Sequence, residues 1–149
     1  MNFRSLSKIL LAIILIFASN TSFAKTIKWS MQGDSLTLDP HAQNEGPTTQ
    51  VSRQVYEALV QRGLDMKIGP ALATKWKATD PNTWIFTLRE DAKFSDGSGM
   101  TSADVVFSIL RAKQRTSDFK EYISTVANVE AVGDYSVKIT TSKPNPILL

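Results

Sequence analysis

The stretch from Trp84 to Lys113 constrains the fold most, because it predicts a strand, a turn and a helix in direct succession. Over Trp84–Leu88 apolar residues occupy every second position, the pattern of a strand with one face on a core. Ser95–Gly99 then supplies turn residues, since Gly tolerates positive φ and Asp bonds nearby backbone. Thr101 to Asp104 matches a helix capping box. The stretch therefore predicts an α/β fold in which these elements pack on one another.

The helix that begins after Thr101 is predicted to be amphipathic. Its expected inner face comprises Ala103, Val106, Phe107 and Leu110. Arg111 and Lys113 stand near its far end, where cationic side chains suit the negative end of the helix dipole.

The rest of the chain is predicted to alternate between short strands and helices. Periodicity and turn signals indicate strands at Thr26–Gln32, Asn128–Val132 and Ser136–Thr141, with a hairpin turn at Gly133-Asp134. They also indicate a helix at Gln50–Val60 capped by Thr48 or Thr49, a helical turn at Pro70–Trp76, a polar connection at Lys77–Asn82 and a short helix at Phe119–Val126.

The first 24 residues have the pattern of a secretory signal peptide. Two positive charges precede an unbroken apolar run, Ile9–Phe17, and small residues stand at Ser22 and Ala24. The alternative is a membrane anchor, but the run is well short of the ~20 residues that span a bilayer. We therefore expect export and cleavage after Ala24.

Composition excludes several classes of function. The chain has 149 residues, within the size of one domain, and a net charge of +3. Loss of Arg4 and Lys8 with the signal peptide leaves 15 basic and 14 acidic residues, so no nucleic-acid partner is expected. The absence of Cys excludes disulfides and thiol chemistry, and predicts no lipid anchor at the export junction.

His41 and two aspartates are the candidates for catalysis. His41 is the one histidine, and no nucleophile or carboxylate partner stands out beside it, so a turn residue or surface donor is favoured. Asp39 and Asp96 form a candidate carboxylate pair, yet each occupies a position where a turn favours Asp. We expect no catalytic residue, metal site or cofactor. An exported hydrolase is the alternative, and it lacks a G-x-S-x-G elbow.

Five ordered motifs carry a resemblance to a known family. The central one comprises Phe86, Leu88-Arg89, Lys93-Phe94, Asp96-Gly97, Thr101, Asp104-Val105 and Phe107-Ser108. The others are Thr37–His41, Val55–Val60, Pro70–Ala73 with Trp76, and Val129–Ile139 with Pro144–Pro146. In this order they resemble the family 5 extracellular solute-binding proteins, the peptide- and nickel-binding components of ABC importers.

The resemblance implies a periplasmic binding protein-like fold of type II, with a mixed sheet and packed helices. Family members are much longer, and this chain resembles their N-terminal portion only. The expected division is therefore a signal peptide at 1–24 and, at 25–149, the N-terminal part of a solute-binding domain with an incomplete lobe and the second lobe absent.

The resemblance also implies a function: a periplasmic component that binds peptides or a similar small solute and delivers it to a membrane permease. Nickel chelates, haem, glutathione and oligosaccharides stay open as ligands, and a truncated fragment without transport function is an alternative. In oligopeptide-binding relatives an extended piece after this loop pairs its backbone with the peptide. That piece corresponds to Glu45, Gly46 and Pro47, of which Pro47 lacks an N–H.

Overall fold

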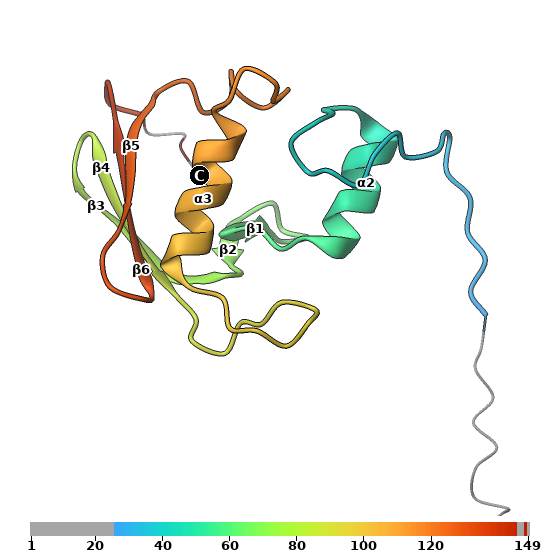
Figure 1. Cartoon of the computed structure of the whole chain (residues 1–149), viewed down its shortest axis with the longest axis horizontal. Coiled ribbons are helices and arrows are strands. Elements are labelled where there is room, and N and C mark those ends of the chain that lie inside the picture. Colours follow the sequence, from blue (N-terminus) through green and yellow to red (C-terminus); the bar gives the residue numbers. More distant parts are fainter. Residues whose placement is uncertain (1–25, 146–147, 149) are drawn as a thin grey trace, which may run out of the picture. The chain divides into compact units, whose positions relative to one another are not determined.

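Four antiparallel strands in the computed structural model form a sheet of order β3-β4-β6-β5, and helix α3 packs on one of its faces (Figure 1). The structure describes residues 26–145 and 148. The sheet comprises β3 (Ala73–Asp80), β4 (Thr83–Leu88), β5 (Val126–Ala131) and β6 (Ser136–Thr141), and α3 spans Ser102–Ala112. A two-stranded sheet of β1 (Val60–Arg62) and β2 (Ile68–Pro70) and helix α2 (Gly46–Val55) precede it. These elements all lie in one compact unit that starts at Met31.

The core forms where α3 crosses from β4 to β5. Both strands pair antiparallel with β6, so they run in the same direction and the helix connects them over one face. The side chains buried there are Phe86, Leu88, Val105, Val126, Val129, Val137 and Ile139. Burial of each such side chain stabilises the fold by about 1.5–3 kcal/mol. The α/β fold class is confirmed.

Several local predictions are confirmed. The strand predicted at Trp84–Leu88 is β4, and the strand predicted at Ser136–Thr141 is β6. The N–H of Thr101 donates to Asp104 Oδ2 at 2.8 Å, as a capping box requires. Both predicted turns contain a glycine at positive φ, Gly97 at 89° and Gly133 at 72°.

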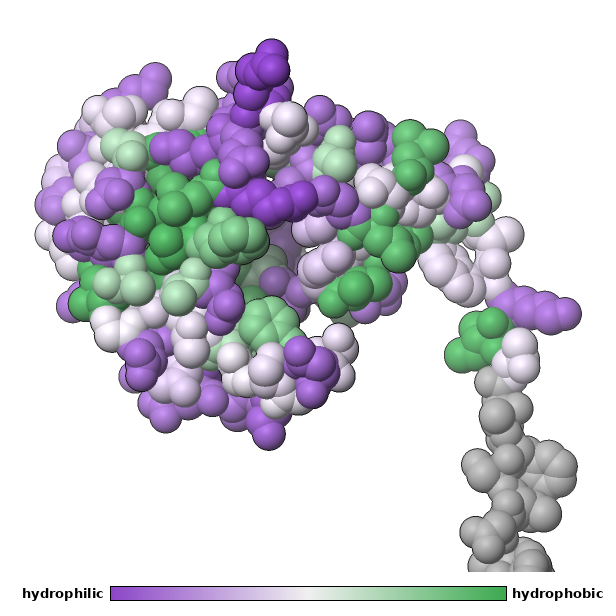
Figure 2. All heavy atoms as spheres, viewed as in Figure 1, coloured by the Kyte–Doolittle hydropathy of each residue, from purple (hydrophilic) through white to green (hydrophobic). Residues whose placement is uncertain are grey.

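The predicted inner face of α3 is only partly confirmed: Val106 packs against the core, whereas Ala103 is exposed. Phe107 and Leu110 are 69% and 49% exposed, and Figure 2 shows hydrophobic side chains gathered over this region. The face on the sheet carries Val105 and Ala112, with Val106 and Ile109 partly buried beside them. The helix carries two apolar stripes, and its first residue is held by a hydrogen bond from Ser102 Oγ to the carbonyl of Gly133 at 2.6 Å.

Three other elements differ from the prediction. Pro70–Trp76 was expected to be helical, but Pro70 ends β2 and Ala73–Trp76 opens β3. The polar connection expected at Lys77–Asn82 continues β3 to Asp80. Phe119–Val126 forms turns up to the start of β5. In the first two cases strand pairing with β1 and β4 supplies hydrogen bonds that local preference does not predict, whereas turn hydrogen bonds such as Tyr122 N–H to the Phe119 carbonyl hold the third segment.

The first predicted helix begins and ends earlier than expected. α2 runs from Gly46 to Val55, with Glu45 as its N-cap in place of Thr48 or Thr49. The strand predicted at Thr26–Gln32 is wrong. None of the described strands includes this segment or pairs with it, and Ile27 is 85% exposed. The signal peptide predicted at 1–24 lies outside the described residues.

Candidate functional site

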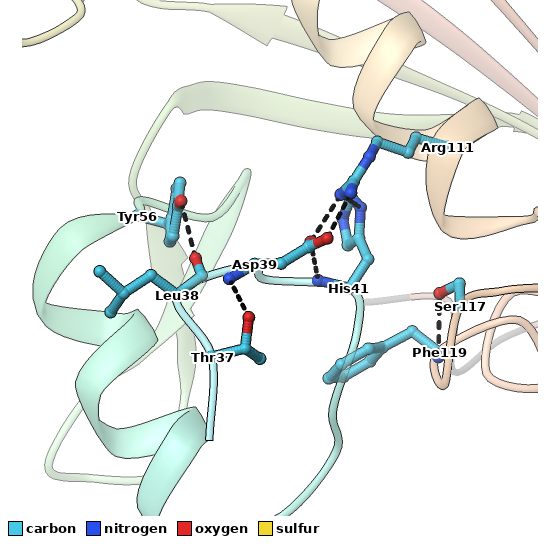
Figure 3. A network of polar contacts seen from close by, with 8 residues as sticks. All are labelled: Thr37, Leu38, Asp39, His41, Tyr56, Arg111, Ser117 and Phe119. Atoms are coloured by element: carbon cyan, nitrogen blue, oxygen red, sulfur yellow. Dashed lines mark hydrogen bonds and ion pairs between the residues drawn. The ribbon is translucent and has the colours of Figure 1, made fainter. Parts of the chain in front are cut away.

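Asp39, His41 and Arg111 meet in one polar group, here called the Asp39 cluster (Figure 3). Two guanidinium nitrogens of Arg111 donate to the two carboxylate oxygens of Asp39, at 2.7 and 2.5 Å. Arg111 Nη1 also lies 3.0 Å from Nδ1 of His41. Because a guanidinium only donates, that nitrogen accepts and the ring proton of His41 lies on Nε2. The cluster thus joins the loop before α2 to the last turn of α3.

The electrostatics of the cluster favour one set of protonation states. The side-chain hydrogen bonds from Arg111, and then the backbone N–H of His41, hold the pKa of Asp39 well below its usual range. Burial and then the Arg111 charge lower the pKa of His41 from 6.5, while the Asp39 charge acts in the opposite direction. The hydrogen bond to Asp39 raises the pKa of Arg111. The pair is therefore ionised at neutral pH, and His41 is neutral.

Further hydrogen bonds attach the same short motif to its surroundings. The Tyr56 hydroxyl donates to the carbonyl of Leu38 at 2.9 Å, and the N–H of Asp39 donates to Thr37 Oγ1 at 3.0 Å (Figure 3). The N–H of Asp118 donates to the carbonyl of His41 at 3.0 Å. Residues 37–41 are therefore tied to the end of α2, to α3 and to the loop after α3.

The predicted ligand-binding segment, Glu45 to Pro47, is only partly extended. Glu45 has extended backbone, but Gly46 and Pro47 form the first turn of α2. The carboxylate of Glu45 accepts from the N–H of Thr48 at 2.8 Å, and its carbonyl accepts from Thr49 at 3.0 Å. Pro47 has no N–H. Within the described part of the chain, the N–H of Gly46 has no hydrogen-bond partner.

A polar pocket of about 200 Å³ lies beside the Asp39 cluster. Its lining residues are Asp39, His41, Ala42, Arg111, Gln114, Thr116 and Ser117. Glu45, Gly46 and Pro47 are not among them. The structure thus separates the pocket lining from the predicted ligand-binding segment.

The two candidate carboxylates, Asp39 and Asp96, have different hydrogen-bond partners. Asp39 pairs with Arg111, whereas Asp96 accepts two hydrogen bonds from Ser98 within its own turn. His41 lies in a turn, as predicted, but its Nδ1 accepts from Arg111 rather than acting as a donor. Within residues 26–145 and 148, no three His, Cys, Asp or Glu side chains are placed to hold a metal ion.

Sequence reasoning missed the role of Arg111. Arg111 lies in the last turn of α3, where the helix dipole alone is enough to explain a cationic residue. Nothing local to either residue indicated a pairing across 72 positions with Asp39.

In the described part of the chain, no helix is sufficiently long and apolar to cross a bilayer.

Comparison with known proteins assigns this arrangement to a family. The family model "Bacterial extracellular solute-binding proteins, family 5 Middle" matches residues 67–149. The periplasmic oligopeptide-binding protein OppA of Escherichia coli K12 is 31% identical over 129 residues, which cover 74% of this chain and 24% of OppA. The chain thus spans about a quarter of that relative's length.

Two solved structures share the fold. The Escherichia coli murein tripeptide binding protein MppA superposes with a TM-score of 0.74 and 32% identity, covering 78% of this chain and 26% of MppA. NikZ from Campylobacter jejuni, in complex with Ni(L-His), gives a TM-score of 0.70 and 25% identity, covering 78% of this chain and 24% of NikZ. The chain belongs to the bacterial extracellular solute-binding proteins of family 5, which bind solutes and are not enzymes.

Proposed function

We propose that this protein is the periplasmic substrate-binding component of an ABC importer, and that it binds peptides for delivery to a membrane permease. The observation that carries this proposal is the fold shared with a murein tripeptide binding protein over 78% of this chain. The similarity to an oligopeptide-binding protein supports the same ligand class. Export with cleavage after Ala24 is part of the proposal, as is the assignment of 25–149 to the N-terminal part of the solute-binding domain.

The backbone of Glu45, Gly46 and Pro47 is the proposed contact with ligand. Backbone pairing suits a receptor that accepts varied peptides, because every peptide presents the same N–H and C=O groups. Helix formation uses the carbonyl of Glu45 and the N–H groups of Thr48 and Thr49. That leaves the N–H of Gly46, without a partner among the described residues, as the donor for a ligand carbonyl or carboxylate.

Calorimetric titration of the complete gene product tests the ligand class. Trialanine is expected to bind, with Ni(L-His) and glutathione as the competing solutes. Saturable binding of Ni(L-His) or glutathione without any binding of trialanine would replace the peptide proposal by that ligand. N-terminal sequencing of protein from the periplasmic fraction tests export, and the expected first residue is Lys25.

A matched pair of substitutions tests the Gly46 contact. Gly46→Pro removes the N–H at the first helical position, where Pro is tolerated and where the extended Glu45 suits a following Pro. Gly46→Ala keeps the N–H, and its Cβ meets nothing within 4 Å beyond its two neighbours in the chain. Both variants place a Cβ before Pro47, so that restriction is common to the pair. Loss of one hydrogen bond is expected to weaken trialanine binding by a few-fold to about tenfold in Gly46→Pro alone. Equal affinity in both variants would remove Gly46 from the site.

A further inference from the structure

We infer that Arg111 is a positioning residue for ligand binding: by holding Asp39 and His41, it fixes the loop that presents Glu45 and Gly46. This inference rests on the proposed function, because it concerns the same ligand-binding segment. Arg111 itself is not proposed to touch the ligand.

Arg111 projects from a helix that is fixed at both ends. At its start, the N–H of Ser102 donates to the carbonyl of Asp134 at 2.7 Å, and Ser102 Oγ donates to Gly133. At its end, Lys113 Nζ donates to the carbonyl of Val126. Val105 and Ala112 are buried between these ends. The guanidinium is therefore carried by a rigid element.

The loop that Arg111 holds is short and is closed on itself. Three residues separate His41 from Glu45. At the far side, Thr48 is 1% exposed, and its Oγ1 accepts from the N–H of Leu36 at 3.0 Å. A connection of three residues has little freedom once both sides are held. The position of His41 therefore restricts where Glu45 can lie.

Other contacts keep the loop folded when the ion pair is weakened. Asn44 Nδ2 lies 2.9 Å from the Tyr122 hydroxyl, and the carbonyl of His41 accepts from Asp118. Substitution of Arg111 is thus expected to loosen the loop without unfolding the domain. A looser loop occupies its binding-competent arrangement for a smaller fraction of the time, and the apparent affinity falls by that fraction.

The test compares Arg111→Lys and Arg111→Ala with a matched control, Arg89→Lys, in the complete gene product. Arg89 also pairs with a carboxylate, that of Glu57 at 3.1 Å. Its described ion pairs, with Glu57 and Asp91, involve none of residues 36–48. Lysine keeps the charge and loses the two-pronged geometry. Trialanine affinity is measured by calorimetry, and residue-resolved hydrogen exchange is followed without ligand.

Both Arg111 variants are expected to bind trialanine about tenfold more weakly than wild type. A loss of this size is expected if the loop adopts its binding-competent arrangement about one-tenth of the time. The amides of His41, Thr48 and Thr49 should exchange faster, since their acceptors are Asp39 and Glu45. The amide of Val132, bonded to Ser136, should be unchanged. Arg89→Lys should behave as wild type in both measurements.

Unchanged affinity and unchanged exchange at Thr48 and Thr49 in Arg111→Lys and Arg111→Ala would overturn the inference. So would weaker binding without faster exchange, because Arg111 would then act directly. If wild type binds no trialanine, the proposed peptide function fails and the ligand part of the inference fails with it. In that case exchange at Thr48 and Thr49 still decides whether Arg111 orders the loop.

Discussion

Arg111 and Asp39 are 72 positions apart in the sequence and are joined by two parallel hydrogen bonds, of 2.7 and 2.5 Å. Their side chains are 37% and 33% exposed, so water screens the pair only in part. A two-pronged arginine–carboxylate pair of this kind is stronger than a single surface contact. It joins the Thr37–His41 motif to helix α3.

The first prediction concerns the strength of this pair. Asp39→Asn and Arg111→Lys are each expected to lower the free energy of unfolding by about 1–2 kcal/mol, and a double-mutant cycle should give a coupling of about 1 kcal/mol. Urea denaturation measures both quantities. The pair Lys67–Asp65, at 84% and 59% exposure, is the control and should couple by less than about 0.5 kcal/mol. Equal couplings in the two pairs would contradict the prediction.

The second prediction concerns pH and His41. The folded pKa of His41 lies below 6.5, so the unfolded chain binds more protons just below that pH. The free energy of unfolding should therefore fall as the pH drops from neutral through 6.5 towards the folded pKa. His41→Asn retains a side-chain acceptor and removes the titration, and its stability should be flatter over this range.

Urea denaturation at several pH values between 7.5 and 5 provides the measurement. The chain has one His, so the difference between wild type and variant isolates that side chain. The lowered pKa of Asp39 acts in a separate window, below about pH 4, where its stabilisation is lost as the pH falls. Parallel stability curves for wild type and His41→Asn would show that the ring does not titrate with folding.

The third prediction concerns the core beneath α3. Val137, the second residue of β6, is 0% exposed, and Val137→Ala should lower the free energy of unfolding by about 1.5–3 kcal/mol, through lost burial and the cavity left behind. Val132→Ala is the control, because Val132 is 50% exposed, and it should change stability by less than about 0.5 kcal/mol. A similar loss in both variants would argue against the described core.

The fourth prediction concerns the start of α3. Asp104→Ala removes the acceptor of the Thr101 N–H and should cost about 1 kcal/mol of unfolding free energy. Asp91→Ala removes the same charge from a side chain that is 88% exposed, and it should cost much less. Thermal unfolding of the two variants gives the comparison. If Asp91→Ala proves as costly, charge rather than capping would explain the loss.

The elements that were predicted correctly are those whose signals are local. Alternation over five residues identified β4, and the Thr101–Asp104 spacing identified the start of α3. Gly133 identified the turn between β5 and β6, because its φ of 72° is one that other residues rarely adopt. Such signals act over one turn or one strand, so they predict the element correctly whatever its tertiary contacts are.

The elements that were predicted wrongly depended on partners. α3 carries two apolar stripes, and only its docking on the sheet decided that Val105 is buried while Phe107 stays exposed. Ala73–Trp76 became a strand because β4 lies beside it. Gly46 and Pro47 were placed in an extended piece, but Glu45 caps a helix that includes them. Local preference carries no information about such neighbours.

By itself, the sequence determined the family, through five motifs in a fixed order, and the turns and caps that punctuate the chain. Only the tertiary structure decided the Asp39 cluster, which assembles Asp39 and His41 from one loop with Arg111 from a distant helix. The physical reason is range. Capping and periodicity act between near neighbours, whereas an ion pair across 72 positions exists only after both elements have docked on the same core.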